Sequence, residues 1–345
     1  MYRLIHRSMV SNSETKPSSP LAGFCIYSLP AIMLMSFLIG LSQIAMTRSL
    51  PDNLFHSEKK LETSQSITLF ELLAQVYESK ILHPPMPYDP NALLSKRTIL
   101  ALENGGAEEI HRICSQYGLF GDFKEADIAL KVEECIWVST LLLASTGRAG
   151  RKPRLDFFLM HLVTSSLFLQ SFFAVLEKPE HKVALLNAYI PVLVLTTLTR
   201  GRPRINPELM MSYTDVPRPP VSAGNKSEPS SKYIGNPQND SDYNPWPAII
   251  EAAQYYHDSH VPKTLRTLIF ASQKYGDKAP GAAIGAFHRD SGAETHNGTG
   301  KMDGTIFVRA AGLVVDTFGW VNYGEKEGEW DRSALGWDGA WDSGD

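Results

Sequence analysis

Apolar residues recur at helical spacing through most of the chain. The pattern predicts helices over 67–82, 92–104, 107–117, 124–145, 155–176, 183–199, 247–259, 263–275 and 304–319. Residues that break helices, mainly Pro and Gly, fall between these segments. The alternation of apolar and polar residues that would indicate strands is nearly absent. We therefore expect a mainly α fold, an irregular multi-helix domain.

The two most apolar predicted helices, 155–176 and 183–199, form a helical hairpin. Basic residues precede the first arm and follow the second, as expected of two membrane spans whose outer ends lie on one side. The second arm is only about 17 residues long, near the lower limit for a span, and it contains Asn187 and Pro191. These features favour a buried apolar hairpin in a soluble core, with the membrane interpretation as the alternative.

Two segments lie outside this helical pattern. Residues 1–50 combine a Ser-rich leader with an uncharged stretch, 21–47, which is long enough for a membrane anchor but is diluted by Pro and polar residues. Residues 206–245 are rich in Pro, Ser, Asn and Gly and predict a long loop. We expect one helical domain over 51–345, in a cytoplasmic protein unless residues 21–47 attach it to a membrane.

The charge distribution bears on whether the protein binds nucleic acid, and the cysteines bear on its redox compartment. The formal net charge is −4, and residues 320–345 alone carry seven acids and two basic residues, a net −5. A nucleic-acid-binding protein would need a basic face, so this class is disfavoured. The three cysteines, Cys25, Cys114 and Cys135, form neither a disulfide framework nor a metal-like spacing, which indicates a reducing compartment.

The first candidate site lies on one face of the predicted helix 155–176. Helical spacing places His161, Thr164, Ser165, Phe168 and Phe172 on this face. Such a face fits the wall of a pocket for a flat aromatic ligand, with His161 available for proton transfer near neutral pH. The alternative is a core histidine whose ring bonds to the neighbouring hydroxyls, and the sequence leaves both interpretations open.

A second candidate lies in the stretch 257–263. His257 and His260 are three residues apart, and a helix would place them on one face with Lys263 one turn further on. Two histidines at this spacing can share a metal ion, but no third ligand follows from the spacing. Pro262 suits the first turn of the next helix, so we expect His260 at a helix junction, held in place yet partly accessible. An acid–base role is favoured over a metal site, with a helix-end cap as the alternative.

Arginine residues supply two candidate anion sites. Arg309, on the predicted helix 304–319, is either a buried structural residue or a clamp for a phenolate, carboxylate or phosphate. The cluster Arg200, Arg202 and Arg204 can hold a cofactor phosphate, with a solvated basic turn as an equal alternative. Neither a glycine-rich nucleotide motif nor a Gly-x-Ser-x-Gly elbow accompanies them.

Six stretches, taken in the order in which they occur along the chain, resemble a known family. They are Leu155-Asp-Phe-Phe-Leu-Met-His-Leu-Val-Thr-Ser-Ser166, Arg200-Gly-Arg-Pro203, Asn244-Pro-Trp246, His257-Asp-Ser-His-Val-Pro-Lys263, Asp303-Gly304 through Arg309-Ala-Ala-Gly312, and Trp330-Asp-Arg332 through Gly336-Trp-Asp338. Together they resemble the fungal questin oxidase-like family over roughly residues 60–341. Residues 1–42 do not resemble the longer helical region, with its His/Asn-rich stretch, that usually opens family members.

The resemblance implies a helical oxidoreductase of fungal secondary metabolism, from pathways to anthraquinone-derived and aflatoxin-type polyketides, including mycotoxins. It also implies an NADPH-dependent monooxygenase that performs a Baeyer–Villiger-type oxygen insertion beside a ketone of a tricyclic aromatic. Its partners would be a small aromatic polyketide and molecular oxygen. The resemblance does not indicate whether a flavin or a metal ion takes part, and it transfers no catalytic residues.

We therefore predict an enzyme of this type and assign its residues from their chemistry. The predicted catalytic residues, for proton transfer and oxyanion stabilisation, are His161, His257, His260, Lys263 and Arg309. The predicted substrate-binding residues are Thr164, Ser165, Phe168, Phe172 and Trp320. The predicted cofactor-binding residues are Arg200, Arg202 and Arg204. The alternatives are a truncated paralogue that binds a pathway intermediate without turnover, and a membrane-anchored protein with the hairpin in lipid.

Overall fold

The computed structural model describes residues 66–119, 122–220 and 243–342. Within these ranges the chain forms ten α-helices and three short 3-10 helices, with no β-strand, so the prediction of a mainly α fold is confirmed. The helices are α3 (Leu69–Glu78), α4 (Leu94–Leu102), α5 (Gly106–Cys114), α6 (Glu125–Ala144), α7 (Phe157–Val175), α8 (Pro179–Thr199), α9 (Pro207–Ser212), α10 (Trp246–Ala252), α11 (His260–Tyr275), η2 (Thr299–Lys301), α12 (Ile306–Phe318), η3 (Val321–Tyr323) and η4 (Asp338–Trp341).

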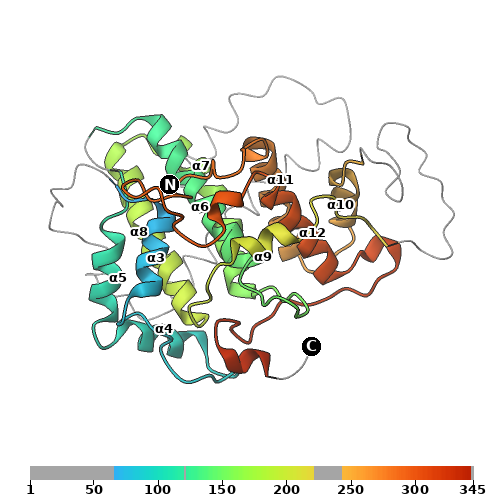
Figure 1. Ribbon diagram of the computed structural model, residues 1–345, viewed down its shortest axis with the longest axis horizontal. Coiled ribbons are helices and arrows are strands. Elements are labelled where there is room, and N and C mark those ends of the chain that lie inside the picture. Colours follow the sequence, from blue (N-terminus) through green and yellow to red (C-terminus); the bar gives the residue numbers. More distant parts are fainter. Residues whose placement is uncertain (1–65, 120–121, 221–242, 343–345) are drawn as a thin grey trace, which may run out of the picture.

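Helices α6 and α7 form the centre of the fold and pack along each other (Figure 1). Helices α3, α4, α5 and α8 pack together on one side of this pair, and α10, α11 and α12 lie on the other side. One continuous cluster of buried apolar side chains runs through these helices. The first turn of α7, where the candidate histidine face begins, therefore lies between the two groups of helices.

The apolar hairpin predicted from the sequence is present as α7 and α8. Both helices are long and apolar enough to cross a membrane, but 50% and 56% of their apolar windows are buried within the fold. A core helix of a soluble protein has the same properties, so these two helices are weak evidence for a membrane protein. The other candidate membrane segment, 21–47, lies outside the described residues.

The predicted helix 247–259 is wrong in extent, because α10 ends at Ala252 and α11 already begins at His260. Between them the carboxylate of Glu327 accepts hydrogen bonds from the backbone N–H groups of His257 and Asp258. A carboxylate distant in sequence thus satisfies donors that a continuing helix would have used. Helical periodicity could not predict this interruption.

Part of the predicted loop 206–245 also differs from expectation. It begins with the short helix α9, whose first turn contains Pro207 and whose cap is Asn206, with the side-chain oxygen accepting from the N–H of Leu209. These are ordinary start signals for a helix, which the polar composition of the region obscured. Residues 221–242 of the loop lie outside the described part of the chain.

Residues 330–342, called the C-terminal arm below, fold back across the start of α7 and the segment after α8. Trp337 donates its indole N–H to the carbonyl of Met86 at 2.9 Å. Gly201 lies directly against the arm with φ +86°, and a Cβ atom there would lie 2.4 Å from a ring carbon of Trp337. Only glycine combines this backbone conformation with so close an approach.

Candidate active site

The site is built on a buried ion pair beneath the first turn of α7. Arg200 Nε and Asp156 Oδ2 are 2.8 Å apart, and their side chains are 1% and 0% exposed. The other oxygen of Asp156 accepts hydrogen bonds from the backbone N–H groups of Phe158 and Leu159, and so caps the N-terminus of α7. Every oxygen of this buried carboxylate is therefore bonded, as a charge in the interior requires.

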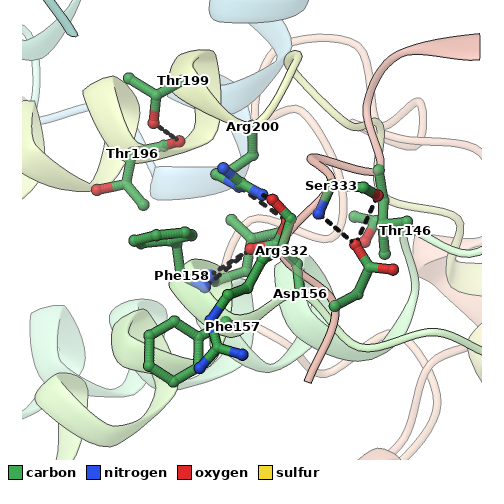
Figure 2. Close-up of polar contacts among 12 residues, drawn as sticks. Thr146, Asp156, Phe157, Phe158, Thr196, Thr199, Arg200, Arg332 and Ser333 are labelled. Atoms are coloured by element: carbon green, nitrogen blue, oxygen red, sulfur yellow. Dashed lines mark hydrogen bonds and ion pairs between the residues drawn. The ribbon is translucent and has the colours of Figure 1, made fainter. Parts of the chain in front are cut away.

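The C-terminal arm is attached to the same turn by its backbone. The N–H of Phe157 donates to the carbonyl of Asp331 at 2.8 Å, and the N–H of Asp331 donates to the carbonyl of Leu155 at 2.9 Å. Arg200 also donates through Nη2 to the carbonyl of Arg332 at 2.9 Å. These bonds place the guanidinium of Arg332 over the ring of Phe157, 4.2 Å from its centroid (Figure 2).

Phe157 joins this arm to two histidines that come from different helices. Its ring centroid lies 4.7 Å from that of His161 on α7 and 5.1 Å from that of His260 on α11. The two imidazole rings are themselves 5.3 Å apart between centroids. The N-terminal turns of α7 and α11 and the C-terminal arm thus converge on one cluster of rings.

His161 is a neutral imidazole in this cluster. Its Nδ1 lies 2.8 Å from the carbonyl of Phe157, and because a carbonyl only accepts, Nδ1 carries the proton and Nε2 is the acceptor. Burial lowers the pKa of His161 to about 4, and the nearby His260 and Lys263 act in the same direction. The ring bonds to a main-chain carbonyl, not to the neighbouring hydroxyls that the sequence offered as an alternative.

His260 is paired with a carboxylate and remains accessible. Its Nδ1 lies 2.7 Å from Oδ1 of Asp258, and the same oxygen accepts the backbone N–H of His260. The two side chains are 27% and 34% exposed. The carboxylate fixes the tautomer with the proton on Nδ1 and leaves Nε2 able to accept a proton from a ligand. The prediction of a helix-junction histidine, held yet accessible, is confirmed.

The carboxylate of this pair is ionised. Burial raises the pKa of Asp258, but the hydrogen bonds from His260 and the charge of Arg332 outweigh burial and hold this pKa below its usual value. Lys263 lies one turn along α11, where burial lowers the pKa of its ammonium group despite the attraction of Asp258. The cluster therefore combines two imidazoles, one carboxylate and cationic side chains.

His257 lies outside this cluster. Its side chain is 94% exposed, and its Nδ1 lies 2.9 Å from Glu327. The expectation that His257 and His260 share one helical face is wrong, because α11 starts at His260. Among the described residues, no group of three or more His, Cys, Asp and Glu side chains has an arrangement suited to a metal ion.

The predicted substrate-binding residues on α7 are directed mainly into the protein. The hydroxyls of Thr164 and Ser165 donate to carbonyls of their own helix, those of His161 and Leu162. Phe168 is buried with the guanidinium of Arg266 above its ring, 5.7 Å from the centroid, and Phe172 is partly buried. Trp320 is buried after α12 and donates its indole N–H to Asp316 at 2.8 Å.

Arg309 lies away from the ring cluster, at the contact between α12 and the segment after α9. Its Nε donates to the hydroxyl of Thr305 at 2.8 Å, and its Nη1 donates to the carbonyls of Met211 and Tyr213. Its Nη2 also lies 3.3 Å from Asp215. These contacts match the structural alternative offered from the sequence.

The predicted cofactor arginines bond to the protein itself. Arg200 is buried and forms an ion pair with Asp156, as described above. Arg202 donates to the carbonyls of Val76, Ser79 and Leu82, and so closes the C-terminal end of α3. Arg204 is exposed and donates to the carbonyl of Tyr77.

Three members of the ring cluster received no role from the sequence: Phe157, Asp258 and Arg332. Each lies in a stretch that carries the family resemblance, so the sequence marked the stretch but did not single out the residue. The hydrogen bond that His260 donates to Asp258 could have been predicted, since the two residues are two positions apart in the sequence. The approach of Arg332 to Phe157 was not, because 175 positions separate them in the printed sequence.

Comparison with known proteins agrees with the resemblance. The family model described as questin oxidase-like matches residues 33–268, whereas no curated protein matches the chain. The match begins earlier than the residues that carried the resemblance, contains His161, Asp258 and His260, and ends before the C-terminal arm. The chain therefore belongs to the questin oxidase-like family, and this membership indicates an oxidoreductase of polyketide pathways.

Proposed function

We propose that this protein is a Baeyer–Villiger-type monooxygenase acting on a hydroxylated aromatic polyketide, such as an anthraquinone. Molecular oxygen supplies one atom to the bond beside a ketone and one to water, and NADPH supplies the two electrons. Family membership supports the oxidoreductase class and the polyketide substrate. The observation that carries the residue assignment is the Asp258–His260 pair, accessible and in ring contact with His161 and Phe157.

In this proposal His260 is the general base. Its Nε2 accepts the proton of a phenolic hydroxyl on the substrate, while Asp258 holds the ring and stabilises the imidazolium that forms. The resulting phenolate is more electron-rich and more readily oxidised than the phenol. Proton transfer by a positioned side chain contributes about 10²–10⁴-fold in rate.

In this proposal His161 has a different role from His260. A pKa of about 4 keeps it neutral at physiological pH, so its Nε2 accepts a hydrogen bond but takes up no proton. It orients a second hydroxyl of the substrate beside the base. Lys263, whose charge helps to lower the pKa of His161, stabilises the oxyanion that forms when a peroxide, made from O₂ with the two electrons of NADPH, adds to the carbonyl carbon.

The cluster Arg200, Arg202 and Arg204 does not fit the phosphate of NADPH. Arg200 is fully buried on a carboxylate, and Arg202 is bonded to three carbonyls. A phosphate would have to break these bonds and leave Asp156 unpaired in the interior, which is strongly unfavourable. We assign no step of the reaction to these arginines.

The test is an aerobic assay of the purified chain with NADPH and a hydroxyanthraquinone such as questin, following product mass and NADPH loss. The expected product is heavier by one oxygen atom, and labelled O₂ should place one labelled atom in it. Reactions without NADPH or without O₂ are the controls. Folded protein that binds the anthraquinone but forms no product would contradict the proposal and favour a binding protein without turnover.

A further inference from the structure

The guanidinium of Arg332 is held in place but forms no ion pair with a carboxylate of the described residues. It stacks over Phe157 at 4.2 Å, and within the described residues it makes no ion pair and donates no side-chain hydrogen bond. Arg332 is also exposed to solvent. None of the five N–H donors of its guanidinium bonds to another described residue.

The backbone on both sides of Arg332 is fixed from several directions. The N–H of Asp331 bonds to Leu155 before α7 and its carbonyl to Phe157, the first residue of α7, and its carboxylate lies 2.6 Å from Arg154. The carbonyl of Arg332 itself accepts from the buried Arg200. The following Ser333 donates its N–H and hydroxyl back to Asp331. Such attachment restricts where an otherwise flexible side chain can place its charge, which lowers the entropic cost of binding a ligand there.

The surroundings of this guanidinium suit a flat anion. Phe157, His161 and His260 are partly buried rings, and both imidazoles stand at an angle to Phe157. An aromatic ligand bound at Arg332 would therefore have aromatic rings as neighbours. The planar fork of an arginine pairs with carboxylates and other oxyanions through two parallel hydrogen bonds. The charge of Arg332 helps to lower the pKa of Asp258, but that carboxylate is already bonded to His260.

We propose that Arg332 is an anion-binding residue of the active site, which binds an ionised phenolate or carboxylate oxygen of a planar aromatic ligand. The ligand class rests on the proposed function, and the inference adds that the ligand is recognised in its anionic form. Arg332 thereby takes the clamp role that the sequence suggested for Arg309. The C-terminal arm is the element that carries this residue to the helical core.

The test measures binding alone, with a ligand that is not turned over. Anthraquinone-2-carboxylate and its neutral carboxamide are titrated into the full chain by calorimetry, for the wild type, Arg332→Gln and Arg332→Lys. Loss of a charge-assisted hydrogen bond should weaken carboxylate binding about tenfold to a hundredfold in Arg332→Gln and leave carboxamide binding unchanged. Arg332→Lys should restore part of the affinity, since it keeps the charge but not the fork.

A matched control is Arg112→Gln, which removes an exposed arginine whose ion pair with Glu109 lies within α5. It should leave the affinity for both ligands unchanged. Equal weakening of both ligands by Arg332→Gln, unchanged carboxylate binding, or no binding to the wild type would each overturn the inference. Selective carboxylate binding without turnover of questin would instead support the inference and contradict the proposed function.

Discussion

Two arginines lie over two consecutive phenylalanines at the start of α7, and they differ in almost every other respect. Arg200 lies 4.5 Å from the ring centroid of Phe158, is 1% exposed and is paired with Asp156. Arg332 lies 4.2 Å from the ring centroid of Phe157, is exposed and has no ion-pair partner among the described residues. Figure 2 shows both arginines around the same turn.

The difference teaches that the charge of the surrounding sequence does not decide whether an arginine is buried in an ion pair or remains exposed. Arg200 lies in a basic cluster that suggested a cofactor site, yet its charge neutralises a buried carboxylate that caps α7. Arg332 lies in the acidic stretch 320–345, yet its guanidinium is exposed over Phe157 in the ring cluster. We call the buried pair Arg200 and Asp156 the buried layer, and the accessible His260 and Arg332 the exposed layer, to which the proposed chemistry is assigned.

The largest effect is expected from the exposed layer. His260→Asn should lower kcat by about 10²–10⁴-fold, because it removes the proton acceptor while keeping a side chain of similar polarity. His257→Asn is the matched control, since His257 also pairs with a carboxylate but is 94% exposed and outside the ring cluster. Steady-state kinetics on both variants, with circular dichroism to verify folding, makes the comparison. Equal losses in the two variants would remove His260 from the role of base.

The buried layer should affect stability most. Arg200→Met leaves the Asp156 carboxylate unpaired in the interior, so the free energy of unfolding should fall by about 3–5 kcal/mol. Urea denaturation at neutral pH measures this change. The double variant Arg200→Met/Asp156→Asn should recover part of the loss, because it removes the uncompensated charge and keeps an oxygen to cap α7. A loss below about 1 kcal/mol in the single variant would show that the pair is not as buried as described.

The pH dependence of stability should separate His161 from its exposed surroundings. Because burial lowers the pKa of His161 from 6.5 to about 4, the unfolded chain binds a proton between these values that the folded chain does not. As far as His161 is concerned, the free energy of unfolding therefore has its full value above pH 6.5. It decreases as the pH falls toward 4, by at most about 1.4 kcal/mol per pH unit.

His161→Gln does not titrate, so its stability should fall less steeply than that of the wild type between pH 6.5 and 4. The measurement is a series of urea denaturation curves across this range. His296, whose pKa burial also lowers, is present in both proteins, so the difference between the two slopes isolates His161. Identical slopes would mean that His161 is not buried as a neutral ring.

The smallest effect is expected at the outer end of the C-terminal arm. Arg148 pairs with Asp338, whose side chain is 96% exposed, and water screens such a pair. Arg148→Gln should change neither the urea midpoint nor the affinity for anthraquinone-2-carboxylate measurably. A marked loss of carboxylate binding in this variant would show that the whole arm, and not only its inner attachment, positions Arg332.

Much of the fold was predictable because most helices bury an apolar face. Periodicity located α6 within one residue at each end, and it located α7 and α12 within two. It failed at α10, where the carboxylate of Glu327 takes over backbone donors from a distant part of the chain. It also passed over α9, where a proline and an asparagine cap mark a helix within a polar segment.

The candidate site was predictable only where its chemistry is local. His260 was identified because Pro262 places a helix start beside it, and His161 because it is the titratable residue on a helix face with Phe168 and Phe172. Thr164 and Ser165 bond to carbonyls of their own helix, because a hydroxyl on a helix bonds to the preceding turn as readily as to a ligand. Arg309 is engaged by backbone carbonyls and Asp215, which no spacing could indicate.

The sequence by itself determined the helical class, the family and the polar stretches from which the site is drawn, because these depend on local periodicity and on residue identity. Only the tertiary structure decided which of these residues meet. The packing of α7 against α11 and the attachment of the C-terminal arm bring His161, His260 and Arg332 around Phe157. Buried charges and backbone donors must find partners wherever the fold provides them, and those partners lie far apart along the chain.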